Sequence, residues 1–155
     1  MDRRTFVAAL PLGTLPLAHA HHGWGSFDQT KPLWLSGRVG KVAWRNPHAE
    51  FELEVDAEPK LPADLAGRTM PAQSAPVDAP ALLKAVRLPT RRDRRWQVEL
   101  APISRMEAWK VAPLKGGERV DLIGFTFPGE KGDAVLRVEY LFVGNAVYAL
   151  RSSPA

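Results

Sequence analysis

Histidine is the residue type whose placement in this sequence points most directly to chemistry. Three histidines lie beyond residue 20, namely His21, His22 and His48, and the first two directly follow Ala18-His19-Ala20. Small residues in this A-x-A arrangement are typical of a signal-peptidase site. Cleavage after Ala20 would make His21 the first residue of the mature chain, with its α-amino nitrogen and its imidazole both available to one metal ion.

These nitrogen donors predict a copper site. A terminal amine has a pKa of about 8 and loses its proton readily when a metal competes for it. His48 follows Pro47 in a predicted turn and can supply a third nitrogen. Cu(II) prefers tetragonal nitrogen coordination and has the highest affinity of the divalent first-row metals, whereas zinc on imidazoles and water is the alternative. Asp28 and Glu50 are candidate oxygen ligands or hydrogen-bond partners of the ligands.

A purely structural role for the histidines stays open. A chain end that directly follows a cleavage site is often solvated, and a histidine in a turn often hydrogen-bonds to the backbone. The metal site at His21, His22 and His48 is therefore a hypothesis that the spacing favours but does not establish.

Residues 1–20 are predicted to be an export signal of the twin-arginine kind. Arg3-Arg4 precede an apolar stretch, residues 6–17, which is too short to span a bilayer and contains two prolines and a glycine. We therefore expect a periplasmic protein, with a ragged cytoplasmic N-terminus as the alternative. No later apolar run is long enough for a membrane span.

The composition is that of one modest domain, residues 21–155. The formal net charge of the whole chain is +4, and removal of the signal, with two arginines and one aspartate, leaves +3. This mild basicity does not by itself indicate a nucleic-acid partner. The chain has no cysteine, so neither disulfides nor thiolate metal sites are available.

Hydrophobic periodicity predicts a chain built mostly of strands. Residues 49–56 alternate cleanly, with Phe51, Leu53 and Val55 on one face and three glutamates on the other. The alternation at 33–44 slips once, as in a bulged strand. Further strands are predicted at 96–100 and 119–127 and in a hairpin about Gly144-Asn145, residues 134–143 and 146–150.

This order of elements favours a small five- to six-stranded OB-like Greek-key barrel with one short helix. The helix, residues 102–110, follows the third strand and carries Ile103, Met106 and Trp109 at helical spacing, so we expect it to close one end of the barrel. A β-sandwich is the alternative fold. Residues 57–80 hold five prolines and are predicted to form a flexible insertion, followed by a short helical turn over 82–88.

A cluster of arginines is the second candidate site. Arg91, Arg92, Arg94 and Arg95 directly precede Trp96. OB-type barrels often bind polyanions with basic grooves and aromatic side chains, but a periplasmic location argues against nucleic acid. We therefore expect an anionic periplasmic partner, with a solvated basic loop as the alternative.

Several motifs resemble those of a bacterial family of exported domains of unknown function. The resemblance rests on His21-His22 with Phe27-Asp28, on Trp44-Arg45-Asn46-Pro47-His48, and on the stretches 35–39, 96–100 and 114–120. This chain differs in its longer Pro-rich segment at 57–80 and in Ala108, where the pattern has glycine before tryptophan. The resemblance implies export and a small β-domain, and it implies no activity.

The sequence therefore predicts an exported ligand-binding protein, with copper held by the N-terminal histidine as its most specific hypothesis. No Ser/His/Asp triad, phosphate loop or paired-carboxylate site can be recognised, so an enzyme is less favoured. The two alternatives are a mononuclear copper redox enzyme and a metal-free interaction module for an anionic partner.

Overall fold

Six strands form the framework of the protein. The computed structural model describes residues 23–155, so the predicted export signal and the predicted ligands His21 and His22 lie outside the described residues. The strands are β1 (Leu33–Trp44), β2 (Ala49–Val55), β3 (Arg95–Glu99), β4 (Arg119–Phe125), β5 (Val135–Val143) and β6 (Ala146–Ala149). The helices are α1 (Ala79–Ala85) and α2 (Ile103–Ala108), with the 3-10 turns η1 (Trp24–Ser26), η2 (Leu65–Gly67) and η3 (Pro128–Glu130).

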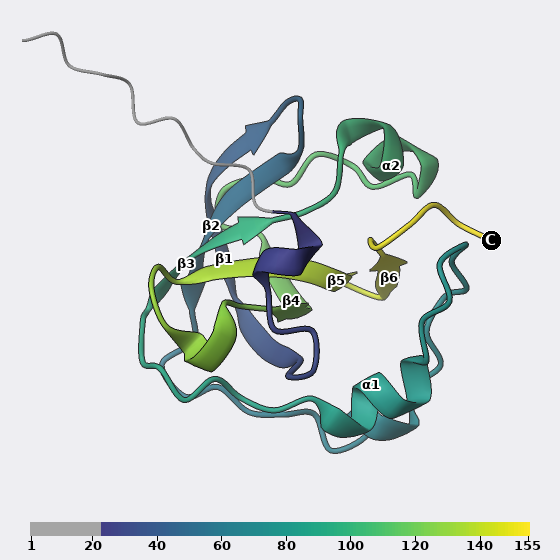
Figure 1. Cartoon of the computed structure of the whole chain (residues 1–155). Coiled ribbons are helices and arrows are strands. Elements are labelled where there is room, and N and C mark those ends of the chain that lie inside the picture. Colours follow the sequence, from purple (N-terminus) through teal and green to yellow (C-terminus); the bar gives the residue numbers. More distant parts are fainter. Residues whose placement is uncertain (1–22) are drawn as a thin grey trace, which may run out of the picture.

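Five of these strands close into a barrel (Figure 1). The sheet runs in the order β3-β2-β1-β4-β5-β6, and a parallel pairing of β3 with β5 joins its two sides. All other neighbours are antiparallel, and α2 lies between β3 and β4 in the sequence. This is the Greek-key order of an OB-like barrel, so the predicted fold class is confirmed and the alternative β-sandwich is wrong.

The long strand β1 is shared by two sides of the barrel. Residues 33–38 pair with β4 and residues 37–44 pair with β2, with the predicted bulge between Val39 and Val42. Gly37 lies where the two pairings overlap, and a Cβ there would lie within 3 Å of the Glu54 backbone. Glycine is therefore required at this position so that β2 can approach β1 closely.

The apolar faces of the strands fill the interior. Phe51, Leu53, Val98 and Leu136 belong to one buried cluster, as their alternation in the sequence predicts. Met106 of α2 is fully buried in the same cluster, and Ile103 and Trp109 pack against it from the same segment. The predicted role of the 102–110 helix at the end of the barrel is thus consistent with its packing.

The helix in the insertion begins earlier than predicted. Its first turn is formed at Ala79 and Pro80, and the Asp78 carboxylate accepts a hydrogen bond from the Ala81 amide at 3.0 Å. An aspartate cap followed by proline in the first turn is a strong helix start. The prediction of a helical turn over 82–88 is wrong at its end, because Val86 is extended and Arg87 forms a bridge with Leu33.

Residues 57–80 build a second apolar cluster on the outside of the barrel. Leu65 of η2 and Leu83 of α1 are buried against Trp34, Tyr140 and Phe142, which point outward from the sheet. Gln73 adds a hydrogen bond to the buried Glu139 carboxylate at 3.0 Å. The segment is irregular, as its prolines imply, and it is attached at these points, whereas its predicted flexibility stays a prediction.

The attachment can be tested with two leucines of the same segment. Leu65 is 4% exposed and Leu61 is 39% exposed. Leu65→Ala should lower the free energy of unfolding by about 2–5 kcal/mol, because it leaves a cavity in a packed cluster. Leu61→Ala should change it by less than about 0.5 kcal/mol. Urea unfolding followed by tryptophan fluorescence measures both, and equal effects would contradict the packing described here.

Candidate functional site

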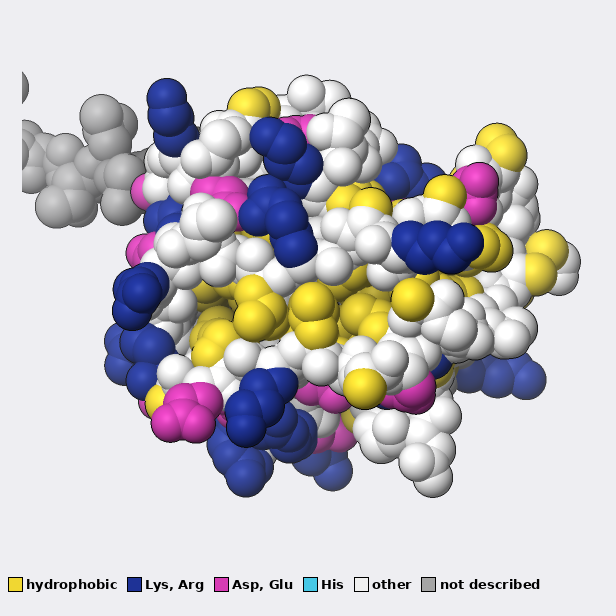
Figure 2. Space-filling model, turned by 90° about the horizontal axis from the view of Figure 1, so that it is seen from below, with side chains coloured by type: hydrophobic (Ala, Val, Ile, Leu, Met, Phe, Trp, Pro, Cys, Tyr) yellow, Lys and Arg dark blue, Asp and Glu magenta, His cyan; other side chains and the backbone are white. Residues whose placement is uncertain are grey.

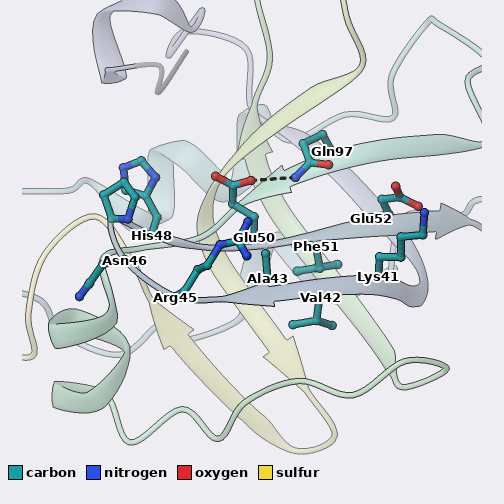
Figure 3. Close-up of a pocket in the computed structure, with 11 residues that line it drawn as sticks. Lys41, Val42, Ala43, Arg45, Asn46, His48, Glu50, Phe51, Glu52 and Gln97 are labelled. Carbon is teal, nitrogen blue, oxygen red and sulfur yellow. Dashed lines mark hydrogen bonds between the residues drawn. The ribbon is translucent and has the colours of Figure 1, made fainter. Parts of the chain in front are cut away.

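His48 and Glu50 line one open pocket on the outer surface of the β1–β2 hairpin. The pocket has a volume of about 350 Å³ and includes Arg45, Gln97 and Lys41 among its lining residues. Figure 3 shows Glu50 near its centre and His48 beside the turn that joins the two strands. The turn contains a cis Asn46-Pro47 peptide bond, and the predicted turn at these residues is confirmed. Two of the predicted metal-site residues thus lie in the same pocket.

Alternation along the strands places a charged row on the outside of the barrel. Phe51, Val98 and Leu136 point into the core, so the residues beside them point outward. Register then aligns Glu50 of β2 with Glu99 of β3 and Glu99 with Arg137 of β5. Because β3 and β5 meet only through barrel closure, this row could not be derived from the sequence.

Glu50 is held by a neighbouring strand. The Gln97 side-chain amide donates a hydrogen bond to the Glu50 carboxylate at 3.2 Å (Figure 3). Gln97 comes from β3 and Glu50 from β2, so the bond crosses the sheet diagonally. The carboxylate is therefore oriented within the pocket and stays partly accessible.

A buried ion pair continues the row away from the pocket. Arg137 and Glu99 approach to 3.6 Å, and both side chains are almost fully buried. Burial lowers the pKa of Arg137, while the Glu99 charge opposes that shift. The removal of one partner from such a pair costs about 3–5 kcal/mol, because the other charge is left buried without compensation.

The described chain begins directly over this ion pair. The Arg137 guanidinium lies 5.1 Å from the centre of the Trp24 ring, and the Arg151 guanidinium lies 4.2 Å from it. Phe125, the register neighbour of Arg137 on β4, meets the same ring edge-on at 6.2 Å. Trp24 thus fixes the first described residues on the face that carries Glu99 and Glu50.

Asp28 does not share the pocket of His48 and Glu50. Its carboxylate accepts hydrogen bonds from the backbone and side chain of Thr30 and faces Lys31. The hydrogen bonds of Thr30 lower the pKa of Asp28. Asp28 lines a separate small pocket with Arg87 and Glu130, so the structure does not bring it together with His48 and Glu50.

Within residues 23–155, no three histidine, aspartate and glutamate side chains are grouped closely enough to hold a metal ion. No helix in this range is long and apolar enough to cross a membrane.

Two of the predicted partner-binding residues, Trp96 and Arg91, make their contacts within the protein. Trp96 is 1% exposed in the barrel core, and its indole N–H donates to the Asp93 carbonyl at 3.1 Å. Arg91 binds the Asp93 carboxylate at 2.7 Å and lies over the Trp96 ring. Trp96 is therefore not a surface platform, because its alternation within β3 places it on the inner face.

Glu130 holds the arginine loop in place. Its carboxylate accepts hydrogen bonds from the Arg87 guanidinium at 2.7 Å, from the backbone and hydroxyl of Thr90, and from the backbone of Arg91. Burial raises the pKa of Glu130, but these bonds outweigh burial and the net direction is downward. The loop before β3 is thus fixed from η3, a part of the chain about forty residues away.

Arg95 of the predicted arginine cluster lies in a row with charged residues that the sequence analysis did not name as a site. Register aligns Arg119 of β4, Arg38 of β1, Glu54 of β2 and Arg95 of β3. Arg119 forms a double hydrogen bond with Asp56, whose pKa is lowered by that contact and by the nearby charges of Arg38 and Arg94. Within residues 23–155, Arg92 and Arg95 are exposed and form no ion pair, whereas Arg94 donates a hydrogen bond to the Val55 carbonyl.

Charge is dispersed on the face below the barrel. Figure 2 shows a band of hydrophobic side chains with Lys and Arg on both sides and with Asp and Glu among them. Basic residues on this face therefore do not form a patch of a single sign.

Comparison with known protein families gives a match over part of the chain. The model of a family of unknown function (DUF6152) matches residues 12–61, which include His21, His22, His48 and Glu50. The predicted resemblance to an uncharacterised family is confirmed for this stretch. Among curated proteins, none matches the chain.

The role of Glu130 gives a pH-dependent prediction. The pKa of Glu130 is lowered in the folded protein, so its charge adds stability at pH values above the ordinary pKa of 4.5. This stability should be lost as the pH falls through the folded-state pKa. Glu130→Gln should lower the free energy of unfolding at pH 7 by about 1–3 kcal/mol, because a buried charged acceptor is lost. The difference in the free energy of unfolding between wild type and variant should narrow as the pH falls below 4.5.

The matched control is Glu58→Gln, the same chemical change at an exposed position. Urea unfolding of the three proteins over the pH series makes the comparison. A gap that stays constant with pH would show that the carboxylate charge is not what stabilises the loop.

Proposed function

We propose that the chain is exported to the periplasm, is cleaved after Ala20, and binds Cu(II) through the amine and imidazole of His21 together with His48. The observation that carries the proposal is the position of His48 and Glu50 in one open pocket, on the face over which the described chain begins. In this function the protein is a copper-binding protein and not an enzyme, and zinc is the competing metal.

Covalent geometry allows this ligand set. His21 lies three positions before Trp24, and three residue steps of extended chain span at most about 11 Å. Arg137, which lies below Trp24, is two strands away from Glu50 in the sheet. This corresponds to about 10 Å. His48 precedes Glu50 by two residues in the same pocket, so the amine and imidazole of His21 are within reach of it.

Glu50 suits the role of a neighbouring oxygen. Its carboxylate is oriented by Gln97 and stays partly accessible in the pocket. Copper nitrogen sites commonly take a weak oxygen donor, and carboxylates near a ligand histidine orient its ring. Glu50 therefore serves either as a weak ligand or as a hydrogen-bond partner of a ligand, while His22 supplies no essential nitrogen.

Cu(II) titration of the exported, processed protein tests the proposal. Mass spectrometry should first find His21 at the N-terminus. Calorimetry should then give one Cu(II) per chain, with paramagnetic resonance parameters of a nitrogen-rich site. Affinity should fall at acid pH, because protons compete for the amine and the imidazoles. Tighter binding of Zn(II) than of Cu(II) would favour the alternative metal.

Insertion of Gly-Ser-Gly between Ala20 and His21 removes the amine chelate and keeps every side chain. Three residues are needed because a histidine in second or third place can bind Cu(II) with the amine and intervening backbone nitrogens. The extended protein should bind Cu(II) about 100-fold more weakly, since the amine no longer acts intramolecularly with His21. His48→Ala should also weaken binding, and His22→Ala should do so less. Unchanged affinity in the extended protein would contradict the proposed ligand set.

A second candidate function is binding of an anionic periplasmic partner. It is favoured by the row of Arg119, Arg38 and Arg95 across the sheet, with Arg92 exposed beside it. Guanidinium groups suit carboxylate and phosphate groups because their donors match both geometrically. Glu54 and Asp56 reduce the positive charge, so a partner would engage individual arginines and not a broad basic field.

A charge-matched pair of variants tests this candidate. The triple variant Arg38→Gln, Arg92→Gln and Arg95→Gln should elute from phosphocellulose at clearly lower salt than wild type, because exposed contacts are screened over about 8–10 Å. The control carries Lys60→Gln, Lys84→Gln and Lys110→Gln, which remove the same charge elsewhere. Equal elution of the two triple variants would mean that net charge alone governs retention.

A further inference from the structure

An open cleft lies between the turn that precedes β1 and the turn η3, apart from the pocket of Figure 3. It has a volume of about 410 Å³ and is lined by Lys31, Arg87, Thr90, Gly129 and Glu130. It adjoins a smaller space of about 10 Å³, which has most of the same lining and also includes Asp28 and Thr126. A space of this size holds about one water-sized atom.

The two carboxylates of the cleft are already bound by other groups. One Glu130 oxygen accepts a hydrogen bond from the Arg87 guanidinium, and the other accepts from the backbone of Thr90 and of Arg91. Asp28 accepts from Thr30 with one oxygen and turns the other toward Lys31. The two carboxylates therefore balance the two cations that line the cleft, and most of their acceptor capacity is in use.

Several hydrogen-bond donors of the cleft are still available. Thr126 is 3% exposed, and its hydroxyl has no hydrogen-bond partner in the described part of the chain. Glu130 engages the Nη1 atom of Arg87, whereas a guanidinium carries five N–H donors. The Lys31 ammonium approaches Asp28 only to 3.7 Å, and the Lys31 side chain is 56% exposed. A ligand that fits these groups must therefore be an acceptor.

We infer that this cleft binds a phosphate group. One phosphate oxygen enters the small space and accepts from the Thr126 hydroxyl, while the others accept from Arg87 and Lys31. The three donors belong to three separate segments, so a tetrahedral group with several oxygens suits them better than a planar carboxylate with two. Guanidinium and ammonium groups both bind phosphate well, and a buried hydroxyl gains from any acceptor that satisfies it.

This site is independent of the proposed copper function, because it contains neither His21 nor His48. It is also distinct from the row of Arg119, Arg38 and Arg95, which lies on other strand positions. The phosphate group can belong to a soluble phosphate compound or to a lipid headgroup, and the donors on the page fit both.

Calorimetry of the purified protein with inorganic phosphate, in a buffer free of other phosphate, tests the site. Wild type should bind one phosphate per chain. Lys31→Gln should weaken binding about 10-fold, the effect of losing one charge-assisted hydrogen bond. The matched control is Lys60→Gln, which removes the same charge from an exposed position outside the cleft and should leave the affinity unchanged. Equal losses in the two variants would overturn the inference.

Thr126→Val removes the buried hydroxyl and keeps the shape of the side chain. Without phosphate, the free energy of unfolding should not fall, because the hydroxyl has no partner to lose. Phosphate affinity should nevertheless fall about 10-fold, since the hydroxyl donates to a charged oxygen. A threonine that serves the fold alone would leave the affinity unchanged, and that result would overturn the inference.

Vesicles distinguish the two sources of the phosphate group. Phosphatidylcholine vesicles that contain phosphatidic acid present a phosphate monoester, and pure phosphatidylcholine vesicles serve as their control. Sedimentation with the phosphatidic-acid vesicles that inorganic phosphate competes away, and that Lys31→Gln abolishes, would support a lipid headgroup as the ligand. Binding of inorganic phosphate without sedimentation would support a soluble phosphate compound. If wild type binds neither inorganic phosphate nor these vesicles, the inference is wrong.

Discussion

The parallel pairing of β3 with β5 is the contact on which the other features of this structure depend. It joins only three register pairs, yet it converts a curved sheet into a barrel with one enclosed core. Its register also sets Glu99 beside Arg137, so the closing contact carries a nearly buried ion pair on its outer face. The cost of burying these charges is offset by their mutual attraction and by the Trp24 ring that covers Arg137.

Closure also decides which distant segments meet on the outer surface. Without it, the start of β2, with Glu50, would lie at one end of an open sheet, and Arg137 and Phe125 would lie toward the other end. With it, the first described residues of the chain and the β1–β2 hairpin share one face. The candidate site therefore depends on long-range topology, although all of its candidate ligands lie within the first 50 residues.

Local features of the fold could be predicted from the sequence because they depend on local chemistry. The alternation at 49–56 and the Gly144-Asn145 turn led to the correct strands, and the spacing of Ile103, Met106 and Trp109 led to α2. The pattern did not predict the start of α1, because Pro80 was grouped with the prolines of an irregular segment, although proline in a first turn favours a helix. The rows Glu50–Glu99–Arg137 and Arg119–Arg38–Glu54–Arg95 depend on register between strands, which no local pattern encodes.

The same distinction explains why some candidate site residues lie together in the structure and others do not. His48 and Glu50 share a pocket because they are two residues apart at the start of β2, whereas Asp28 lines a different pocket. Trp96 was grouped with the arginines that it follows in the sequence, but strand alternation controls its direction and turns it inward. A shared site in this barrel therefore depends on strand position, and closeness in the sequence indicates one only where both residues belong to the same strand end. The contacts of Trp24 follow that rule, since its partners lie on the neighbouring strands β4 and β5 and on the segment after β6, far from Trp24 in the sequence.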